Sequence, residues 1–497
     1  MRILLSWADA GPEIAELMRE LRSHSHEVVY WIGHDGGETY KLPETIFHFY
    51  QDAIDAKPTI GVSGSNFNPP GKDLLEKLHK TESLVLTMMN RLFDRSCVDE
   101  RRHIYYNMIQ YWLGVLNEYK PEIIIFPNMP HFVYDFIIYE LAHFLDIRTL
   151  VFDDTRISGR LLFFNDLHRG SERLQQELEK NKGCVFNLDD LSEDIQRYCR
   201  PRMEKDYDRV PQYIVDRKIK HPFLKWLISD PKVQSSVKNL SFVYKAPRYL
   251  YEILRQKRLK IIKKPLQKMF YKMRYNLKDE YNKVQVKPDL SRDFIYFALH
   301  NQPERSTSPQ GGMFVDQILV IETISSSLPD GWVLYVKEHP VQWIRTGLNF
   351  SSSRYRGYYE NIANIKNVFL VPEETSSYEL IKKAKIVTTV TGAVAWEAAL
   401  QLKPSIIFGT VWYQDCPGIF RVNGVDSCRR AIHEIRSGFE VDRKKLVSYL
   451  KCFDNATIRG FTSPFAGKEA GMNKSESLRN MCRQILKEAA SLGFKRN

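Results

Sequence analysis

The chain contains 497 residues, of which 43% are hydrophobic and 27% are charged. This length predicts at least two domains, and the composition is typical of a globular protein. The sequence holds no run of the ~18 apolar residues that a membrane span requires. The seven cysteines are widely spaced and form no C-x-x-C pair, which predicts reduced thiols in a cytoplasmic protein and no metal site.

The net charge of +12 is concentrated in one segment. Residues 241–290 include 14 Lys or Arg against 4 Asp or Glu, a net charge of +10. One interpretation is the solvent-exposed face of connector helices. Another is a patch that binds anionic lipid on the inner membrane surface, or an anionic polymer. No nucleic-acid-binding motif accompanies these charges, so nucleic acid is not an expected partner.

The first third of the chain alternates strands with helices, which is typical of βαβ units. The apolar run after Met1 reaches an acid at Asp9, which predicts a first strand and not a signal peptide. No G-x-G-x-x-G follows this strand, so a dinucleotide fingerprint is absent. We therefore predict an α/β domain over residues 1–166, built from strand 2–6, helix 13–23, strand 27–32, helices 72–93 and 99–119, strand 122–126, helix 132–145 and strand 148–152.

The pattern changes twice further along the chain. Residues 167–290 are charged and helical in pattern, which predicts the basic connector. Strands and helices alternate again over 291–425, and the remaining residues, 426–497, are expected to be C-terminal helices. The expected elements of the second α/β domain are strand 293–298, helix 314–327, strand 332–337, strand 368–372, helix 376–384, strand 385–390 and strand 405–409. Two Rossmann-like domains joined by a connector fit the GT-B plan, in which the two domains face each other across a cleft.

Polar residues follow several strands of the second domain, where parallel sheets bind their ligands. Lys337 and His339 share one face if their strand continues that far, and both then meet a nucleotide phosphate. Thr391 and Gly392 precede a helix whose N-terminus attracts anions. Glu397 follows on the same helix and is placed to bind ribose hydroxyls. The alternatives are a lone structural histidine, an ordinary capped turn, and an acid favoured only by the helix dipole.

These motifs resemble a known family. The segments Lys337-Glu338-His339-Pro340 and Thr391-Gly392…Trp396-Glu397-Ala398 are similar to the capsular polysaccharide biosynthesis family of bacterial glycosyltransferases, and residues 299–307 also fit. The His-Pro pair further resembles the motif with which bacterial sialyltransferases and Kdo transferases hold the CMP part of a CMP-sugar. This resemblance implies that His339 and Pro340 lie at the nucleotide phosphate, near Thr391 and Gly392.

The catalytic carboxylate is left open by the sequence. The acid-acid-Gly motif of several sialyltransferases is missing, and Asp9-Ala10-Gly11 is only a faint echo of it. A general base has to reach the acceptor hydroxyl. The candidates at predicted strand ends are Asp154, Asp9 and Glu304, followed by Asp35 and Asp153. Three arginines are candidates for holding the carboxylate of an acidic sugar, because the guanidinium fork matches it: Arg156, Arg160 and Arg305.

The favoured hypothesis is a metal-independent GT-B glycosyltransferase without a cofactor. It would move a sugar from a nucleotide-sugar, with a CMP-activated acidic sugar as the first choice, to a capsule or other surface polysaccharide or to a lipid-linked acceptor. A cytoplasmic location, with peripheral attachment to the inner membrane through residues 241–290, fits that role. The alternatives are a sugar-nucleotide epimerase on the same scaffold and a non-catalytic assembly protein that binds glycan or nucleotide.

Overall fold

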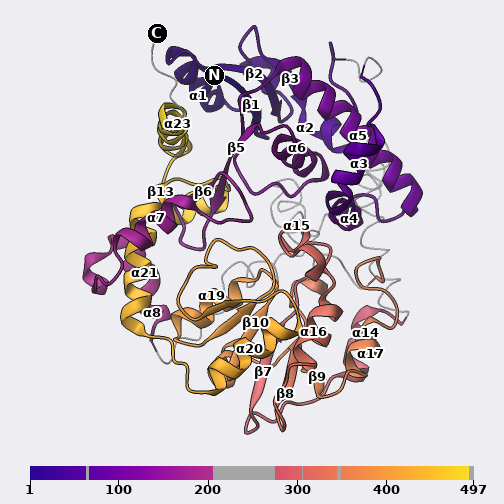
Figure 1. The fold of residues 1–497 in the computed structure, drawn as a ribbon, viewed down its shortest axis with the longest axis vertical. Coiled ribbons are helices and arrows are strands. Elements are labelled where there is room, and N and C mark those ends of the chain that lie inside the picture. Colours follow the sequence, from indigo (N-terminus) through magenta and orange to yellow (C-terminus); the bar gives the residue numbers. More distant parts are fainter. Residues whose placement is uncertain (63–66, 205–274, 305, 344–348, 492–497) are drawn as a thin grey trace, which may run out of the picture.

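The computed structural model describes residues 1–62, 67–204, 275–304, 306–343 and 349–491. Most of the predicted basic connector and Arg305 lie outside the described residues. The described chain forms two α/β domains, one above the other in Figure 1, each built on its own sheet. This is the GT-B-like arrangement that the sequence predicted.

The first domain contains a seven-stranded sheet in the order β13-β6-β5-β4-β1-β2-β3. Strands β5, β4, β1, β2 and β3 are parallel, as expected for βαβ units. Strand β6 pairs antiparallel with β5, and β13 pairs antiparallel with β6. The strands are β1 (Arg2–Ser6), β2 (Glu27–Gly33), β3 (Ile46–Phe49), β4 (Ile123–Phe126), β5 (Arg148–Asp154), β6 (Arg160–Phe164) and β13 (Ile458–Arg459).

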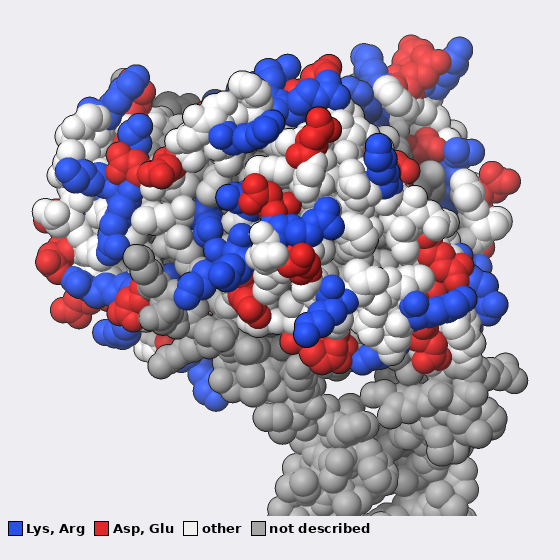
Figure 2. Space-filling model, turned by 90° about the horizontal axis from the view of Figure 1, so that it is seen from below, with Lys and Arg blue, Asp and Glu red and all other residues white. Residues whose placement is uncertain are grey.

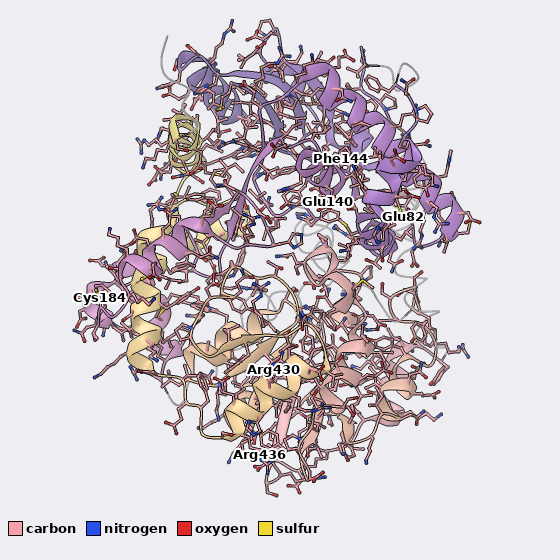
Figure 3. All side chains as sticks on the ribbon, viewed as in Figure 1. Glu82, Glu140, Phe144, Cys184, Arg430 and Arg436 are labelled. Carbon is pink, nitrogen blue, oxygen red and sulfur yellow. The ribbon has the colours of Figure 1, made fainter. Side chains whose placement is uncertain are left out.

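The helices of this domain agree in general with the predicted periodicity. One exception is the single helix predicted over 72–93, which is interrupted at Leu78, where φ is −94° and ψ is 12°. The break lets α4 pack beside α6, where Thr81 donates to Glu140 at 2.7 Å, and Figure 3 shows Glu82 and Glu140 near this contact. The helices are α1 (Pro12–Ser23), α2 (Tyr50–Ile54), α3 (Lys72–Lys77), α4 (His79–Met88), α5 (Val98–Tyr119), α6 (Val133–Phe144), α7 (Glu172–Lys180) and α8 (Glu193–Arg202).

The second domain contains a six-stranded parallel sheet in the order β12-β11-β10-β7-β8-β9. Alternate side chains of β7 and β8 enter two separate apolar clusters, one on each face of the sheet. The strands are β7 (Phe294–Ala298), β8 (Val333–Lys337), β9 (Val368–Leu370), β10 (Ile386–Thr389), β11 (Ser405–Ile407) and β12 (Ile419–Arg421). The helices are α14 (Leu277–Val284), α15 (Thr307–Gln310), α16 (Gln317–Ser325), α17 (Tyr358–Ala363), α18 (Ser377–Lys383), α19 (Ala393–Leu400) and α20 (Val425–Arg436).

The C-terminal part of the chain returns to the first domain. Helix α20 packs against α16 of the second domain, whereas α21 (Arg443–Ala456) packs against α7. The chain then adds β13 to the first sheet, forms α22 (Pro464–Ala470), and packs α23 (Lys474–Ser491) against α1. Figure 1 shows this yellow segment rising beside the first domain. The segment 425–491 therefore contacts both domains.

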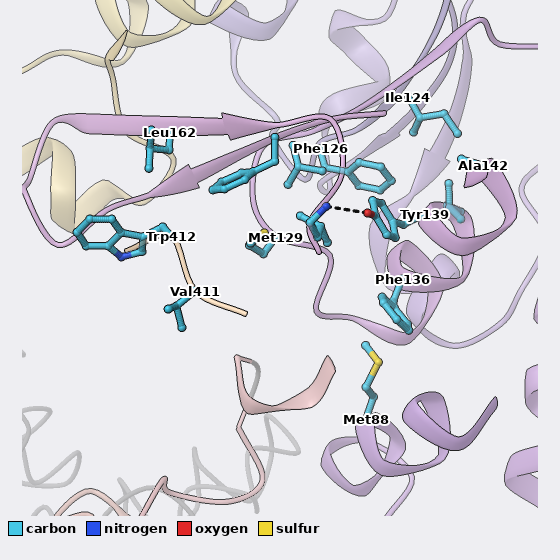
Figure 4. Close-up of a cluster of buried hydrophobic side chains, with 14 of the residues drawn as sticks. Met88, Ile124, Phe126, Met129, Phe136, Tyr139, Ala142, Leu162, Val411 and Trp412 are labelled. Atoms are coloured by element: carbon cyan, nitrogen blue, oxygen red, sulfur yellow. Dashed lines mark hydrogen bonds between the residues drawn. The ribbon is translucent and has the colours of Figure 1, made fainter. Parts of the chain in front are cut away.

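One continuous core of buried apolar side chains includes residues of both domains. Trp396 of α19 and Trp412, which follows β11, have their ring centroids 4.8 Å apart, and Trp412 also lies 5.3 Å from Phe453 of α21. Figure 4 shows Val411 and Trp412 in the same cluster as Leu162, while the Leu167 amide donates to Tyr139 at 3.0 Å. Burial of these rings opposes separation of the two domains.

The surface on the lower side of the second domain has no single sign of charge. Figure 2 shows basic and acidic side chains interspersed there. Among the described residues, no helix is both long enough and apolar enough to cross a membrane.

Replacing Trp412 by alanine should lower the free energy of unfolding by about 3 to 5 kcal/mol, since the substitution leaves a cavity between the domains. Urea unfolding measures this loss. The matched control is Met313→Ala, whose side chain is 67% exposed and whose loss should change stability by less than about 0.5 kcal/mol. Equal losses in the two variants would contradict a shared core at Trp412.

Candidate active site

The carboxyl ends of β7, β8 and β10 lie side by side in the second sheet, because these strands are parallel neighbours. Three polar segments follow them: His300 to Glu304 after β7, Lys337 to Pro340 around the end of β8, and Thr391 with Gly392 after β10. The structure therefore brings together the segments that the sequence predicted to meet at a nucleotide.

The side chains of Lys337 and Glu338 are both buried and hydrogen-bonded to other protein groups. The Lys337 ammonium donates to the Thr375 carbonyl at 2.5 Å and to the Ser377 hydroxyl at 3.0 Å. The Glu338 carboxylate accepts from Arg354 at 3.1 Å and from Tyr359 at 2.6 Å. These bonds attach the end of β8 to α17 and α18, so both side chains hold the loop after β8 in place.

His339 does not share a strand face with Lys337, because β8 ends at Lys337. The His339 backbone donates to Glu338 at 2.7 Å, and its Nδ1 accepts from the Val341 amide at 3.1 Å. The ring is partly exposed, and Pro340 continues the turn.

Thr391 and Gly392 form the turn between β10 and α19. The Thr391 amide donates to His300 Nε2 at 3.2 Å, and the Gly392 amide donates to Thr389 Oγ1 at 3.1 Å. Gly392 has an extended backbone, so its conformation does not require glycine. Glycine is required here by the close approach of a neighbouring side chain, since a Cβ at this position would lie 2.6 Å from Thr389 Oγ1. The first amides of α19 that follow, those of Ala393 and Val394, are the ones at the helix N-terminus.

A pocket of about 620 Å³ opens beside this helix. Its walls come from four parts of the chain: the loop after β5, helix α8, the second domain at α18 and α19, and the C-terminal segment. The charged lining residues are Arg156, Glu193, Asp194, Arg197, Arg202, Glu397, Arg459 and Glu469, and the aromatic ones are Tyr198, Tyr378 and Phe465. The pocket therefore lies between the two domains, and Ala393 at the start of α19 forms part of its wall.

Glu397 is the acid of this pocket that the second domain contributes. Burial raises the pKa of Glu397, and the positive charges of Arg156 and Arg202 oppose that rise. Arg202 also lies 3.7 Å from the centre of the Tyr198 ring, and the Tyr198 hydroxyl accepts from Trp396 at 3.2 Å. Arg156 and Glu397, predicted separately from the sequence, thus face each other across the domain boundary.

Asp153, at the end of β5, is a second acid that Arg156 influences. Burial and the neighbouring Asp154 charge raise the pKa of Asp153 to about 8, and Arg156 opposes the rise. No described residue donates a hydrogen bond to this carboxyl group. Its pKa lies near neutral pH, as suits proton transfer in catalysis.

The three acids preferred from the sequence are bound to protein groups. Asp154 accepts from the Thr462 hydroxyl at 2.6 Å and from the Thr462 and Ser463 amides at 3.0 Å, where α22 begins. Asp9 accepts from Lys474 of α23 at 2.7 Å. Glu304 lies 3.1 Å from His300 Nδ1 and accepts from Thr307 at 2.6 Å. Asp35 is exposed on the loop after β2.

The predicted arginines have different surroundings. Arg156 is exposed and lines the pocket. Arg160 is buried and donates through Nε and Nη2 to Asp194 at 2.7 and 2.8 Å, while its Nη1 lies 2.9 Å from Asp454. This guanidinium fork is engaged by the protein itself and joins β6 to α8 and α21. Arg305 lies outside the described residues.

Several pocket residues were not singled out from the sequence: Arg197, Tyr198, Arg202, Arg459 and Phe465. They belong to segments that reach the pocket only through long-range packing, so no local spacing marks them. His300 was recognised within its segment but was assigned no role. Among the described residues, no group of three His, Cys, Asp or Glu side chains is placed to hold a metal ion.

Residues 305–449 match the family model described as "Capsule polysaccharide biosynthesis protein". Over this segment the chain is similar to the family that the motifs predicted. The family and the two-domain fold agree with the predicted enzyme class, a glycosyltransferase. No curated protein matches the chain.

Solved structures give further, more distant likenesses. The β Kdo 2,4 transferase KpsC of Thermosulfurimonas dismutans is 12% identical, with 68% of this chain and 82% of that chain covered and a TM-score of 0.32. The β Kdo 2,7 transferase of the same protein is 10% identical, with coverages of 75% and 89% and a TM-score of 0.30. The UDP-GlcNAc 2-epimerase of Methanocaldococcus jannaschii is 12% identical, with coverages of 92% and 98% and a TM-score of 0.26. All three TM-scores are low, so the fold assignment rests on the strand order and connectivity of the two sheets.

Substituting Arg160 by leucine should lower the free energy of unfolding by about 3 to 5 kcal/mol, because Asp194 and Asp454 would lose the cation they surround. Urea unfolding provides the measurement. The control Arg200→Leu removes an ion pair with Asp189 whose two side chains are 46% and 83% exposed, and should cost about 1 kcal/mol or less. If Arg160→Leu were as stable as this control, a structural role for Arg160 would be wrong.

Replacing Asp153 by asparagine should change how stability depends on pH. The folded-state pKa of about 8 lies above the ordinary value of 3.8, so folded wild type holds a proton that the unfolded chain releases between these values. Wild-type stability from this group is therefore lost as the pH rises from about 4 to about 8. The melting temperature of Asp153→Asn relative to wild type should increase over that range, and a constant difference would refute the raised pKa.

Proposed function

We propose that this protein is a glycosyltransferase that binds the nucleotide of its sugar donor in the pocket between the two domains. The observation that carries the proposal is the convergence of Arg156, Arg202 and Glu397 beside the first residue of α19. A helix N-terminus with two guanidinium groups suits phosphate, and a carboxylate one turn further suits ribose hydroxyls. The same pocket receives groups from both domains, as transfer between two substrates requires.

Within this proposal, the donor phosphate lies between the Ala393 end of α19 and Arg156 and Arg202. His339, in the turn after β8, is proposed to contribute to phosphate binding as well. As the bond between the anomeric carbon and the phosphate oxygen breaks, these groups stabilise the negative charge that develops on the nucleotide. Such stabilisation needs no cation in addition, so activity is expected to persist in EDTA.

Asp153 is the proposed general base in place of Asp154, Asp9 and Glu304, whose carboxylates are engaged by neighbouring groups. The acceptor hydroxyl gives its proton to the ionised Asp153 carboxylate, and its oxygen forms the new bond to the anomeric carbon. Arg156 favours the ionised form of Asp153, because its charge opposes the rise in the pKa. The raised pKa makes Asp153 a stronger base than an ordinary carboxylate.

A CMP-activated acidic sugar is the proposed donor, and a capsule polysaccharide or its lipid-linked precursor is the proposed acceptor. Support for CMP comes from the His339-Pro340 resemblance, and support for the acceptor comes from the family match over 305–449. The arginines of the pocket suit the carboxylate of an acidic sugar. Attachment to an anionic membrane is part of the proposal through residues 241–290, most of which lie outside the described residues.

The proposal is tested first by binding. A ligand that binds only the folded state raises the melting temperature, so CMP, CDP, UMP, UDP, GDP and ADP are compared in a thermal-shift assay. Wild type should respond selectively to CMP. Arg156→Ala and Glu397→Gln should bind CMP about tenfold more weakly, the effect of losing ~1.4 kcal/mol, so their melting temperatures should rise less at the same CMP concentration. The control is Arg436→Ala, on α20, which Figure 3 shows near the bottom of the second domain.

The outcomes separate the hypotheses. A selective shift with UDP would retain the transferase and discard the CMP-sugar. Conversion of a nucleotide-sugar without any acceptor would indicate the epimerase instead. No shift with any nucleotide would overturn the proposed function and favour the non-catalytic assembly protein.

A further inference from the structure

His300 lies beneath the turn that begins α19, with all of its polar groups engaged. Its ring Nε2 lies 3.0 Å from Thr389 Oγ1 and accepts from the Thr391 amide at 3.2 Å, and its Nδ1 lies 3.1 Å from the Glu304 carboxylate. Its own amide donates to Gln317 at 2.7 Å, and its carbonyl accepts from Arg354 at 2.8 Å. The ring is thus fixed at both nitrogens and at the backbone.

These contacts define the proton position on the imidazole. A backbone N–H can only donate, so Nε2 must present its lone pair to Thr391. The proton of the neutral ring is therefore on Nδ1, directed toward Glu304. The carboxylate selects this tautomer, as the acidic partner of a metal-binding or catalytic histidine commonly does.

The Glu304 carboxylate is kept ionised, so it can accept the hydrogen bond from His300 Nδ1. Burial raises the pKa of Glu304, but hydrogen bonds from His300, Thr307 and Ser306 outweigh that effect and lower the pKa to about 2. The Glu304 amide donates to Gln302 at 3.1 Å. The acid therefore remains an acceptor throughout the neutral range and keeps the proton on Nδ1.

These contacts fix the directions of the backbone amides in the turn before α19. The Thr391 amide is turned inward to His300, and the Gly392 amide is turned inward to Thr389 Oγ1. The Tyr413 hydroxyl donates to the Gly392 carbonyl at 2.5 Å and so holds the next peptide, between Gly392 and Ala393. With these two residues fixed, the following N–H groups, beginning at Ala393, are those presented at the helix N-terminus beside the pocket.

We propose that His300, Glu304 and Thr389 are positioning residues that fix the start of α19 for binding the phosphate of the donor nucleotide. None of the three touches the nucleotide; they act through the Thr391–Gly392 turn. This inference rests on the proposed function, since it assigns the same pocket and specifies what orients its phosphate end. It gives Glu304 a role different from the catalytic one that the sequence suggested.

The test compares nucleotide with nucleoside, because the proposal concerns the phosphate alone. Dissociation constants for CMP and cytidine are measured by calorimetry with the full chain. Glu304→Ala and Thr389→Val should each weaken CMP about tenfold, as expected for the loss of an oriented hydrogen bond of about 1.4 kcal/mol, and should leave cytidine unchanged. If the donor proves to be uridine-based, UMP and uridine replace them.

Conservative variants separate positioning from simple stabilisation. Glu304→Gln keeps an oxygen that accepts from Nδ1, and Thr389→Ser keeps the hydroxyl, so both should restore the CMP-to-cytidine ratio to within about twofold of wild type. Glu304→Ala and Thr389→Val act at separate residues, so if one variant fails to fold, the other still provides the test. Melting temperature and far-UV circular dichroism record folding for each variant.

The failures are distinguishable. If wild type binds CMP more tightly than cytidine and Thr389→Val and Glu304→Ala keep that ratio while only their melting temperatures fall, the positioning role is overturned and the proposed function stands. If wild type binds no nucleotide, the proposed function fails, and this inference fails with it.

Discussion

The arrangement of this molecule depends on the apolar contact between its domains. Trp396 and Trp412 belong to the second domain in sequence, yet they are buried in a core that continues into the first domain. Because Trp396 lies on α19 itself, the contact that joins the domains also fixes the helix whose N-terminus meets the pocket. A rigid element at the junction places groups from both domains around one substrate more accurately than a loop would.

The charges near the strand ends divide into two groups with different functions. One group is buried and satisfied by the protein: Arg160 with Asp194 and Asp454, Glu338 with Arg354, and Asp154 with the start of α22. Breaking such a pair leaves an uncompensated charge, so these residues maintain the frame. The other group includes Arg156 and Glu397, which line the pocket between the domains, and the charge of Arg156 also acts on Asp153. Groups with shifted pKa values in a shared cleft are those that proton transfer and phosphate binding use.

The C-terminal segment contributes part of the pocket wall. After α20 the chain leaves the second domain, pairs β13 with β6 and packs α23 against α1. On this route it contributes Arg459, Phe465 and Glu469 to the pocket wall. The same segment supplies Thr462 and Lys474, which bind the two first-domain acids Asp154 and Asp9. Two acids at strand ends thus anchor the returning chain, whereas no described residue donates a hydrogen bond to the carboxyl group of Asp153 beside them.

Sequence alone determined the α/β class, the two sheets and the strand ends that carry polar motifs, because periodicity and turn residues are local signals. It also identified Arg156, which follows a strand, and Glu397, which lies one turn into a helix. Only the tertiary structure showed that Arg160 forms ion pairs with Asp194 and Asp454. It also showed that His300 accepts from the turn before α19, and that α8 and the C-terminal segment line the pocket. These contacts join residues far apart in the chain, and their partners are chosen by packing and by the need to pair buried charges, neither of which has a signature in local spacing.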